Sequence, residues 1–511
     1  VLVLEAERIF RKKKKNCDQK EMEYLVKYGL GLLKKNIGDV NYWVMTTFNN
    51  PYLIESDIVN IEKMKIKDPH WKKMILFGSE KEVLIINHHL AHAGVYLSTK
   101  FKNAIIVSCD GGGDIDPKTN TNECKVIFKG DHNKITRQDL LIEDFISGKT
   151  YGVCSAFVYG LKLHDLYPSE GKFMALAGFG KVKDEYYNLL EQIFKQIEGA
   201  NYAEVFKILE NNFHDLEGQA VLQTEEAKNF AATVHKFFID KSLDNINYII
   251  KNIFVNEEAI ILTGGAGLNI DLNTKVMQKF PDFKHLVAPC CDDTGQSLGA
   301  LCILISIILD LRAVVDFPFL GEGQDNFNYT SETLDKAVEV LLKDGILILH
   351  NGKSEIGPRA LGNRSFIARP DRLEVKRKLS EKIKQRESYR PVAPAVLEDK
   401  VSEYFIGPKI SPFMLYRYEV IESQITNVIG AVHVDKSARV QTVDRKNNSF
   451  LFDLIKKFGD RTGIYVVLNT SLNLHNEPLT NNIEESLNIY DKIDGPKSII
   501  YNGEIIRTSD S

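Results

Sequence analysis

Short runs of apolar and β-branched residues end in glycine loops at two places in this sequence. Residues 104–109 (Ala-Ile-Ile-Val-Ser-Cys) lead into Asp110 and three glycines, and residues 259–263 (Ala-Ile-Ile-Leu-Thr) lead into a Gly-Gly pair. A long helical pattern, residues 225–253, precedes the second run. Strands that pass into glycine loops and alternate with helices are typical of an α/β sheet that holds its ligand at the strand ends. We therefore expect an α/β fold with functional groups in these loops.

The length of the chain requires more than one hydrophobic core. Single cores usually stop growing at about 250 to 300 residues, and this chain has 511. The periodic pattern lapses in the Gly- and Asn-rich residues 316–329, and a predicted helix (331–343) and a buried strand (346–349) follow. We therefore predict two domains, residues 1–325 and a smaller domain of residues 326–511.

The composition excludes several classes of protein. A net charge of −4 gives no general attraction to nucleic acid or to anionic membranes. The seven cysteines are odd in number and contain no Cys-x-x-Cys pair, which argues against a zinc knuckle and against a secreted disulfide framework. The longest apolar run, residues 298–309, is shorter than a bilayer span and is typical of a buried helix. We expect a cytoplasmic protein without nucleic-acid or membrane partners.

Residues 351–364 read Asn-Gly-Lys-Ser-Glu-Ile-Gly-Pro-Arg-Ala-Leu-Gly-Asn-Arg, a stretch that we call the anion loop. Its glycines allow the backbone to approach a ligand closely, and its proline stiffens the turn. Lys353, Arg359 and Arg364 supply positive charge. This combination is suited to binding phosphate or carboxylate groups.

Two more basic loops follow the anion loop. One carries Lys384 and Arg390 ahead of two prolines, and the other carries Arg439. A polar strand end, Leu-Asn-Thr-Ser-Leu-Asn, carries Asn469. Three basic loops in one small domain favour a phosphate-binding site over three unrelated surface patches.

Two histidines and two aspartates form a candidate metal site. His88 and His92 are spaced i, i+4, so that both imidazoles can reach one cation from a single helical face. Asp110 follows a predicted strand, and Asp293 precedes Thr-Gly at a predicted helix start. Two His and two Asp ligands leave room for substrate and suit a catalytic first-row divalent ion better than a closed structural zinc site. We expect His89 either to support the ligand residues or to be structural.

Other motifs are weaker. The loop from Gly264 and Gly265 to Asn269 follows a strand and opens a predicted helix, so its backbone N–H groups could meet a nucleotide, although a tight turn is an equal alternative. Residues 147–150 (Ser-Gly-Lys-Thr) imitate the end of a phosphate-binding P-loop, but the required upstream glycine is a glutamate, and we reject that interpretation. The Cys-Cys pair at residues 290–291 has no partner for thiol chemistry and is expected to be half-buried beside the loop of Asp293.

The ordered set of motifs resembles the O-carbamoyltransferases of nodulation-factor and antibiotic biosynthesis. Residues 357–365 match their Gly-Pro-Arg-Ala-Leu-Gly-Asn-Arg-Ser signature, residues 170–177 match a Glu-Gly-Lys-Val-Met-Gly-Leu-Ala segment, and residues 5–8 match the start of Glu-Glu-Glu-Arg-Phe. The resemblance covers nearly the whole chain. It implies an actin- and hexokinase-like first domain and a second domain like the threonylcarbamoyl-adenylate synthases.

The resemblance also implies a reaction in two stages. Carbamoyl phosphate and ATP, with magnesium, would give carbamoyl-adenylate, and the carbamoyl group would then pass to a hydroxyl of a small acceptor at a site holding iron(II) or a similar ion. Residues matching the family's phosphate-binding positions are Arg359, Lys384, Arg390, Arg439 and Asn469. Residues expected to contact the nucleotide are Lys13, Glu170, Gly264, Gly265, Asn269 and Lys353.

The sequence also departs from the family pattern. Ala175 replaces a glycine, and the family's first strand, with a histidine that the resemblance makes catalytic, would precede Glu5 and is missing. No residue is therefore assigned as the base that deprotonates the acceptor. Two alternatives stay open: an enzyme of the tRNA threonylcarbamoyl-transfer type and a degenerate nucleotide-binding scaffold. The oligomeric state is also open, with a homodimer as one alternative.

Overall fold

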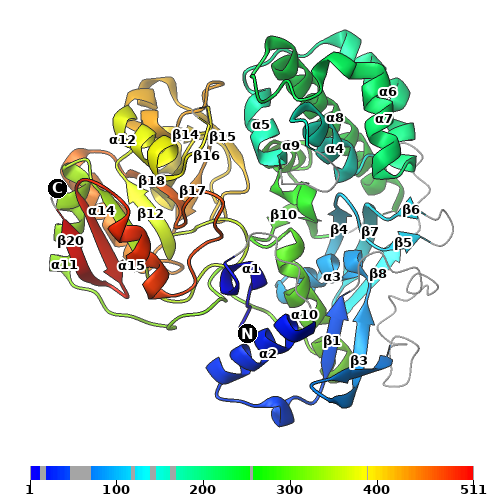
Figure 1. Ribbon diagram of the computed structural model, residues 1–511, viewed down its shortest axis with the longest axis horizontal. Helices are drawn as coiled ribbons and strands as arrows, with labels where there is room; N and C mark the ends of the chain where they lie inside the picture. Colours follow the sequence, from blue (N-terminus) through cyan, green and yellow to red (C-terminus); the bar gives the residue numbers. More distant parts are fainter. Residues whose placement is uncertain are drawn as a thin grey trace. The chain divides into compact units, whose positions relative to one another are not determined.

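A computed structural model describes residues 2–11, 19–46, 71–116, 121–138, 145–161, 169–253, 257–387 and 389–509. The chain forms two compact units with a mixed α/β architecture (Figure 1). The continuous unit comprises Asn41–Val315, and the discontinuous unit combines Val1–Val40 with Asp316–Ser511.

This division differs from the predicted domains 1–325 and 326–511, because the segment Val1–Val40 joins the second unit. The reason is a set of contacts across the sequence. The backbone N–H of Val3 donates to the carbonyl oxygen of Leu320 (2.8 Å), and the Tyr28 hydroxyl donates to the carboxylate of Glu322 (2.7 Å). How functions divide between the two predicted domains stays a prediction.

The continuous unit contains a five-stranded sheet in the order β10-β9-β4-β7-β8. Its strands are β4 (Asn103–Cys109), β7 (Lys125–Asp131), β8 (Lys134–Gln138), β9 (Ala259–Thr263) and β10 (Lys284–Val287). β4, β9 and β10 are parallel, and Ser108 pairs with Thr263. The two predicted strands therefore end side by side, and the residues that follow them lie at the same edge of the sheet.

A smaller sheet in the order β1-β3-β2 and two short strands complete the strand content described for this unit. Their bounds are β1 (Trp43–Thr46), β2 (Trp71–Leu76), β3 (Ser79–Ile86), β5 (Ile115–Asp116) and β6 (Thr121–Asn122). The helices are α3 (His88–Gly94), α4 (Gly148–Val158), α5 (Glu170–Ala177), α6 (Asp184–Gly199), α7 (Tyr202–Phe213), α8 (Glu225–Ile253), α9 (Ile270–Lys279) and α10 (Gln296–Leu309). Helices α4, α6, α7 and α8 gather at one end of the unit (Figure 1).

Helices α3 and α10 pack unusually closely. A Cβ atom added to Gly299 of α10 would collide with the carbonyl oxygen of Ala91, and one added to Gly94 of α3 would collide with the carbonyl oxygen of Gly299. Only glycine permits such a backbone contact. The contact fixes α3, which carries both candidate metal-binding histidines, against the helix that follows Asp293.

The discontinuous unit is built around a seven-stranded mixed sheet in the order β17-β13-β18-β12-β11-β19-β20. The strands are β11 (Ile346–His350), β12 (Arg364–Ala368), β13 (Ala393–Leu397), β17 (Gln441–Val443), β18 (Val466–Ser471), β19 (Lys497–Tyr501) and β20 (Glu504–Ser509). A small sheet consists of β14 (Phe405–Ile406), β15 (Arg417–Val420) and β16 (Ser437–Arg439). The helices are α1 (Ala6–Ile9), α2 (Gln19–Leu32), α11 (Ser331–Leu342), α12 (Leu373–Arg377), α13 (Val401–Tyr404), α14 (Ser449–Thr462) and α15 (Ile483–Asp491).

Strands β11, β12, β13 and β18 are buried almost throughout. The predicted helix at 331–343 and the predicted strand at 346–349 are both present. The apolar run 298–309 lies in α10, which is buried along most of its length as expected, although Leu309 at its end is exposed. Among the described residues, no helix combines the length and apolar character needed to cross a bilayer.

We expect a Gly299→Ala substitution to destabilise the continuous unit by about 1–3 kcal/mol, because the added methyl group must push α3 and α10 apart. Denaturant unfolding measures this loss, and Gly199→Ala is the control because a Cβ there meets nothing within 4 Å. Equal stability of the Gly299 and Gly199 variants would show that the helices yield without cost.

Candidate functional site

Four side chains meet at one edge of the five-stranded sheet. The side-chain oxygen of Asn87 accepts hydrogen bonds from the backbone N–H groups of His89 and Leu90, which starts α3 at His88. Helix geometry then places His92 one turn later on the same face. One ligand atom from each member lies within 4.8 Å of the others in the metal cluster His88, His92, Asp110 and Asp293.

The metal cluster is held together electrostatically. The Nε2 atom of His92 lies 3.2 Å from Oδ2 of Asp110 and 3.4 Å from Oδ1 of Asp293. Burial lowers the pKa of His92, but the two carboxylates outweigh this effect and raise the pKa to about 9. Burial likewise raises the pKa of Asp110, but His88 and His92 hold it well below its usual value.

The donor set fits a divalent ion. Two imidazole nitrogens and two carboxylate oxygens are a mixed ligand set of the kind that first-row transition metals accept. The Nδ1 atom of His92 is buried without a hydrogen-bond partner among the described residues. Sequence reasoning missed Gln296, whose amide Nε2 donates to Oδ1 of Asp293 (2.7 Å) and lies 3.4 Å from Nε2 of each histidine. Its spacing of three residues after Asp293, at the start of a helix, is the signal that could have identified it.

His89 has a structural position. Its ring nitrogens hydrogen-bond with the Ser108 hydroxyl (2.8 Å) and with the carbonyl oxygen of Glu123 (2.9 Å). Burial is the main cause that lowers its pKa to about 3, so the ring is neutral at physiological pH. His89 therefore links β4 to the segment that precedes β7.

The glycine loop touches the metal cluster directly. The backbone N–H of Gly265 donates to Oδ2 of Asp110 (3.0 Å). Gly264 has φ +83°, and a Cβ there would collide with the carbonyl oxygen of Cys109, so the position requires glycine. Asn269 caps α9, where its side-chain oxygen accepts from the N–H of Leu272.

Glu170 is exposed at the first position of α5. It lies close enough to Tyr202 to contribute to a raised pKa of that phenol, whose main cause is burial. The Tyr202 hydroxyl donates to the carbonyl oxygen of Gly111 (2.7 Å), next to Asp110. Asp110 and Glu170 thus both act on the pKa of Tyr202, and a contact of Glu170 with the nucleotide stays a prediction. Lys13 lies outside the described residues.

The Ser-Gly-Lys-Thr sequence is used structurally. The hydroxyl groups of Ser147 and Thr150 both donate to the carboxylate of Glu198, and the Lys149 amine donates to the carbonyl oxygens of Glu198 and Ala200. These bonds fix α4 against the end of α6. Cys290 and Cys291 are fully buried.

The anion loop of the discontinuous unit is organised by buried charges. Oε1 of Glu355 accepts hydrogen bonds from the backbone N–H groups of Leu361 (2.5 Å), Asn363 (3.3 Å) and Arg364 (3.3 Å). The Arg364 guanidinium donates to the carbonyl oxygens of Asn351 and Gly352. The expectation that Arg364 offers charge to a ligand is therefore corrected, because its donors hold the loop's own backbone.

Two other predicted lysines are engaged within the protein. Lys353 forms an ion pair with Asp325. The buried Lys384 amine donates to the carbonyl oxygens of Ser471 and Asn473 (2.7 Å each) and also to both of their side chains. Lys384 thus ties the loop after β18, and its contact with a ligand stays a prediction.

Arginines from all three basic loops act on one another and form the arginine cluster, namely Arg359, Arg386, Arg390 and Arg439. Burial holds the pKa of Arg439 well below its usual value, and the positive charges of the other three lower it further. Burial, Arg390 and Arg359 lower the pKa of Arg386 to about 9. Arg386 was missed as a site residue, although it stands two positions after Lys384 in the second basic loop.

Asn469 lies beneath the anion loop. Its Nδ2 donates to Oε1 of Gln441 (2.8 Å) and to the carbonyl oxygen of Ala360 (3.3 Å), and Nε2 of Gln441 donates to the carbonyl oxygen of Leu361 (2.8 Å). The Oδ1 atom of Asn469 is buried without a hydrogen-bond partner among the described residues. Asn469, in β18, therefore holds the backbone next to Arg359, and its Oδ1 atom remains as an acceptor.

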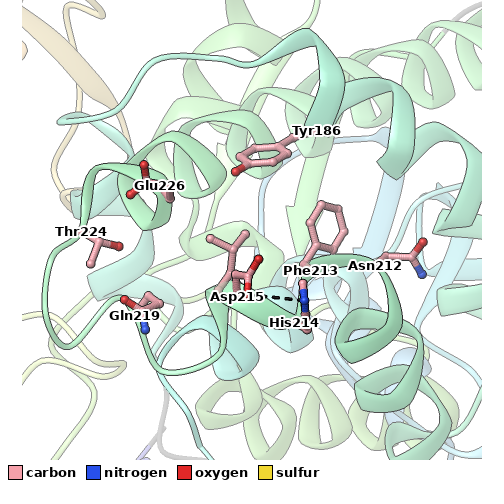
Figure 2. Close-up of a pocket in the computed structure, with 9 residues that line it drawn as sticks. Tyr186, Asn212, Phe213, His214, Asp215, Gln219, Thr224 and Glu226 are labelled. Carbon is pink, nitrogen blue, oxygen red and sulfur yellow. Dashed lines mark ion pairs between the residues drawn. The ribbon is translucent and has the colours of Figure 1, made fainter.

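A separate pocket of about 420 Å³ contains none of the predicted site residues. Figure 2 shows its lining, which includes Tyr186, Phe213 and an ion pair between His214 and Asp215 (3.5 Å). The pocket lies at the carboxyl end of α7, whereas Tyr202, at the other end, contacts the loop of Asp110. Since α7 has 12 residues, about 18 Å of helix separates the two ends. The pocket is therefore not part of the metal cluster.

Comparisons with known proteins cover both units. The family model described as "Carbamoyltransferase N-terminus" matches residues 7–302, and "Carbamoyltransferase C-terminus" matches residues 338–503. The uncharacterized protein MJ1051 of Methanocaldococcus jannaschii is 29% identical over 81% of each chain. Nodulation protein NolNO of Sinorhizobium fredii is 27% identical over 96% of this chain and 75% of that protein. The 3'-hydroxymethylcephem-O-carbamoyltransferase of Amycolatopsis lactamdurans is 30% identical over 62% of this chain and 60% of that enzyme.

We expect the double variant His88→Ala/His92→Ala to lose bound divalent metal, because two carboxylates alone are weak ligands for a first-row ion. Elemental analysis of the purified protein measures the loss. His214→Ala is the control, since that histidine is exposed and lies outside the metal cluster. Stoichiometric metal in the double variant would place the ligands elsewhere.

We also expect His350 to make stability depend on pH. Its Nδ1 hydrogen-bonds with the Ser486 hydroxyl (2.8 Å), and burial, followed by the charge of Arg364, holds its pKa well below the usual value. The unfolded chain therefore takes up a proton below about pH 6.5 that the folded state does not. The free energy of unfolding therefore has its full value above about pH 6.5 and decreases as the pH falls below it, because protonation then favours the unfolded chain.

The measurement is denaturant unfolding between about pH 7.5 and about pH 5.5. His350→Asn, which keeps a polar group near Ser486, is expected to lose less stability on acidification than the native chain. His214→Asn serves as the control, because the His214 side chain is exposed. Identical slopes for the native chain and the His350 variant would contradict this assignment.

Proposed function

This chain belongs to the carbamoyltransferase family, and from that premise we propose that it is an ATP-dependent O-carbamoyltransferase with a small hydroxylated acceptor. Its family implies carbamoyl phosphate and an acceptor as substrates. In the proposed first stage, carbamoyl phosphate, ATP and one water molecule give carbamoyl-adenylate, phosphate and pyrophosphate. In the second stage, the acceptor hydroxyl attacks the carbamoyl carbon and AMP leaves.

The arginine cluster is the observation that carries this proposal. Arg359, Arg386 and Arg390 help to lower the pKa of Arg439, and Arg390 and Arg359 help to lower that of Arg386, so arginines from separate loops lie near one another. Like charges held close together repel one another, so a bound polyanion would relieve that repulsion. Guanidinium groups also present paired N–H donors that match phosphate oxygens, and they can neutralise charge on departing phosphates.

Asn469 supports the choice of carbamoyl phosphate over a simple phosphate. Its amide nitrogen is committed to Gln441 and Ala360, which fixes the orientation of the side chain. The remaining Oδ1 atom is a buried acceptor without a partner among the described residues. A carbamoyl group carries an NH2 that would donate to such an oxygen, so the site combines donors for the phosphate with an acceptor for the carbamoyl end.

The metal cluster is the proposed location of the transfer stage. A divalent ion such as iron(II), held by His88, His92, Asp110 and Asp293, would supply Lewis-acid stabilisation of charge on departing AMP. The N–H of Gly265 already orients the Asp110 carboxylate. Further N–H groups of this glycine loop, together with Glu170, are proposed to contact the nucleotide.

We expect Arg439→Ala and Arg386→Ala each to slow carbamoyl-phosphate-dependent release of pyrophosphate from ATP by about 10²- to 10³-fold, the usual cost of losing one donor to a developing charge. Arg461→Ala is the control, because Arg461 is an exposed residue of α14 that pairs with Glu339. Near-native release by both cluster variants would contradict the proposed adenylate site. Absence of any release from the native chain would contradict the proposed function as a whole.

A further inference from the structure

The first residues of the discontinuous unit contact the anion loop through buried ionic groups. The Arg8 guanidinium donates to the carbonyl oxygens of Glu355 (Nη1, 2.6 Å) and Gly357 (Nη2, 2.8 Å). The carboxylate of Glu5 links Gly357 to Arg8, because Oε1 accepts from the N–H of Gly357 (2.8 Å) and Oε2 pairs with Nε of Arg8 (2.8 Å). The Glu5 and Arg8 side chains are only 7% and 4% exposed.

These contacts restrain the turn that carries Arg359. On one side, Arg8 and Glu5 hold residues 355 and 357. On the other side, the Glu355 carboxylate holds the N–H groups of Leu361 and Asn363. Arg359 therefore sits in the middle of a short turn whose two ends are both fixed.

We propose that Glu5 and Arg8 are positioning residues for Arg359, so that a segment of the chain far away in the sequence sets the geometry of the anion site. This inference rests on the proposed function. A planar guanidinium with two parallel donors fixes both the distance and the direction of the two carbonyl groups, which a lysine ammonium would not. Because displacement of a binding group by about 1 Å can cost up to 10²-fold in rate, the restraint matters for ligand binding as well as for folding.

A merely structural tie would weaken the fold without changing the affinity of the site. The segment offers a matched control for that case. Arg11 also anchors this segment, since it donates to the carbonyl oxygen of Leu479 (2.6 Å) and pairs with Glu477 and Glu485 (3.2 Å each). None of these partners belongs to the anion loop. Arg11→Gln should therefore reproduce the loss of anchoring without disturbing the turn around Arg359.

The experiment compares Arg8→Gln, Glu5→Gln and Arg11→Gln in the full chain. KM for carbamoyl phosphate and kcat are measured by pyrophosphate release, at a temperature where circular dichroism shows each variant folded. Affinity for inorganic phosphate is measured by calorimetry. We expect Arg8→Gln to raise KM for carbamoyl phosphate and the Kd for phosphate by about tenfold, within the range of couplings between contacting residues. Arg11→Gln should leave both close to native.

A double-mutant cycle tests whether Arg8 acts through Arg359. If it does, Arg8→Gln should not weaken phosphate binding further once Arg359→Ala is present. Additive losses, or equal KM values in the Arg8 and Arg11 variants, would overturn the proposal. If Arg8→Gln does not fold, Glu5→Gln, which keeps an oxygen for the Gly357 N–H, replaces it in the same comparison.

Failure of the proposed function gives a different result. If the native chain releases no pyrophosphate, the carbamoyl-adenylate reaction is wrong, and the positioning role is then judged by calorimetry alone. A Kd for phosphate that rises in Arg8→Gln but not in Arg11→Gln supports the role. Equal Kd values reject it.

Discussion

The buried carboxylate of Glu355 is the interaction on which the discontinuous unit depends. It is completely inaccessible to solvent and collects the N–H groups of three residues in the anion loop. A buried carboxylate is costly unless hydrogen bonds and opposite charge compensate it. The positive charges of Arg364 and Arg8 lie close enough to do so. The loop's shape therefore follows from the way this charge is compensated, and β12 begins at Arg364, one of the compensating residues.

The metal cluster depends on a different constraint, which is close approach between backbones. Gly94 and Gly299 bring α3 against α10, and Gly264 allows the loop after β9 to lie against the end of β4. Each contact excludes any side chain larger than hydrogen. Together they bring two histidines of one helix within reach of two aspartates from separate loops. In the discontinuous unit, buried charges fix the functional loop. In the continuous unit, close contacts that only glycine permits fix the candidate metal ligands.

The sequence predicted the features that local pattern controls. Periodicity identified α8 and α11, and the apolar run at 346–349 identified β11. The i, i+4 spacing of the histidines, the strand end before Asp110 and the helix start after Asp293 predicted that these four side chains would meet, as they do. These inferences succeed because helix and strand geometry alone determines which residues share a face or an edge.

Features that depend on distant partners could not be predicted. Arg364 looked like a ligand-binding cation until the carbonyl groups around it were known, and Lys353 likewise pairs with Asp325. Gln296 and Arg386 stand near predicted site residues in the sequence, but their contacts within the clusters come from tertiary packing. The place of the segment Val1–Val40 is the largest difference between the predicted domains and the observed units.

That segment and Asp316–Ser511 form one compact unit, and the whole of the continuous unit lies between them in the sequence. A ribosome therefore completes the continuous unit before the discontinuous one has its second half. Since domains generally fold as units during synthesis, the half with the metal cluster can be finished while the arginine cluster does not yet exist.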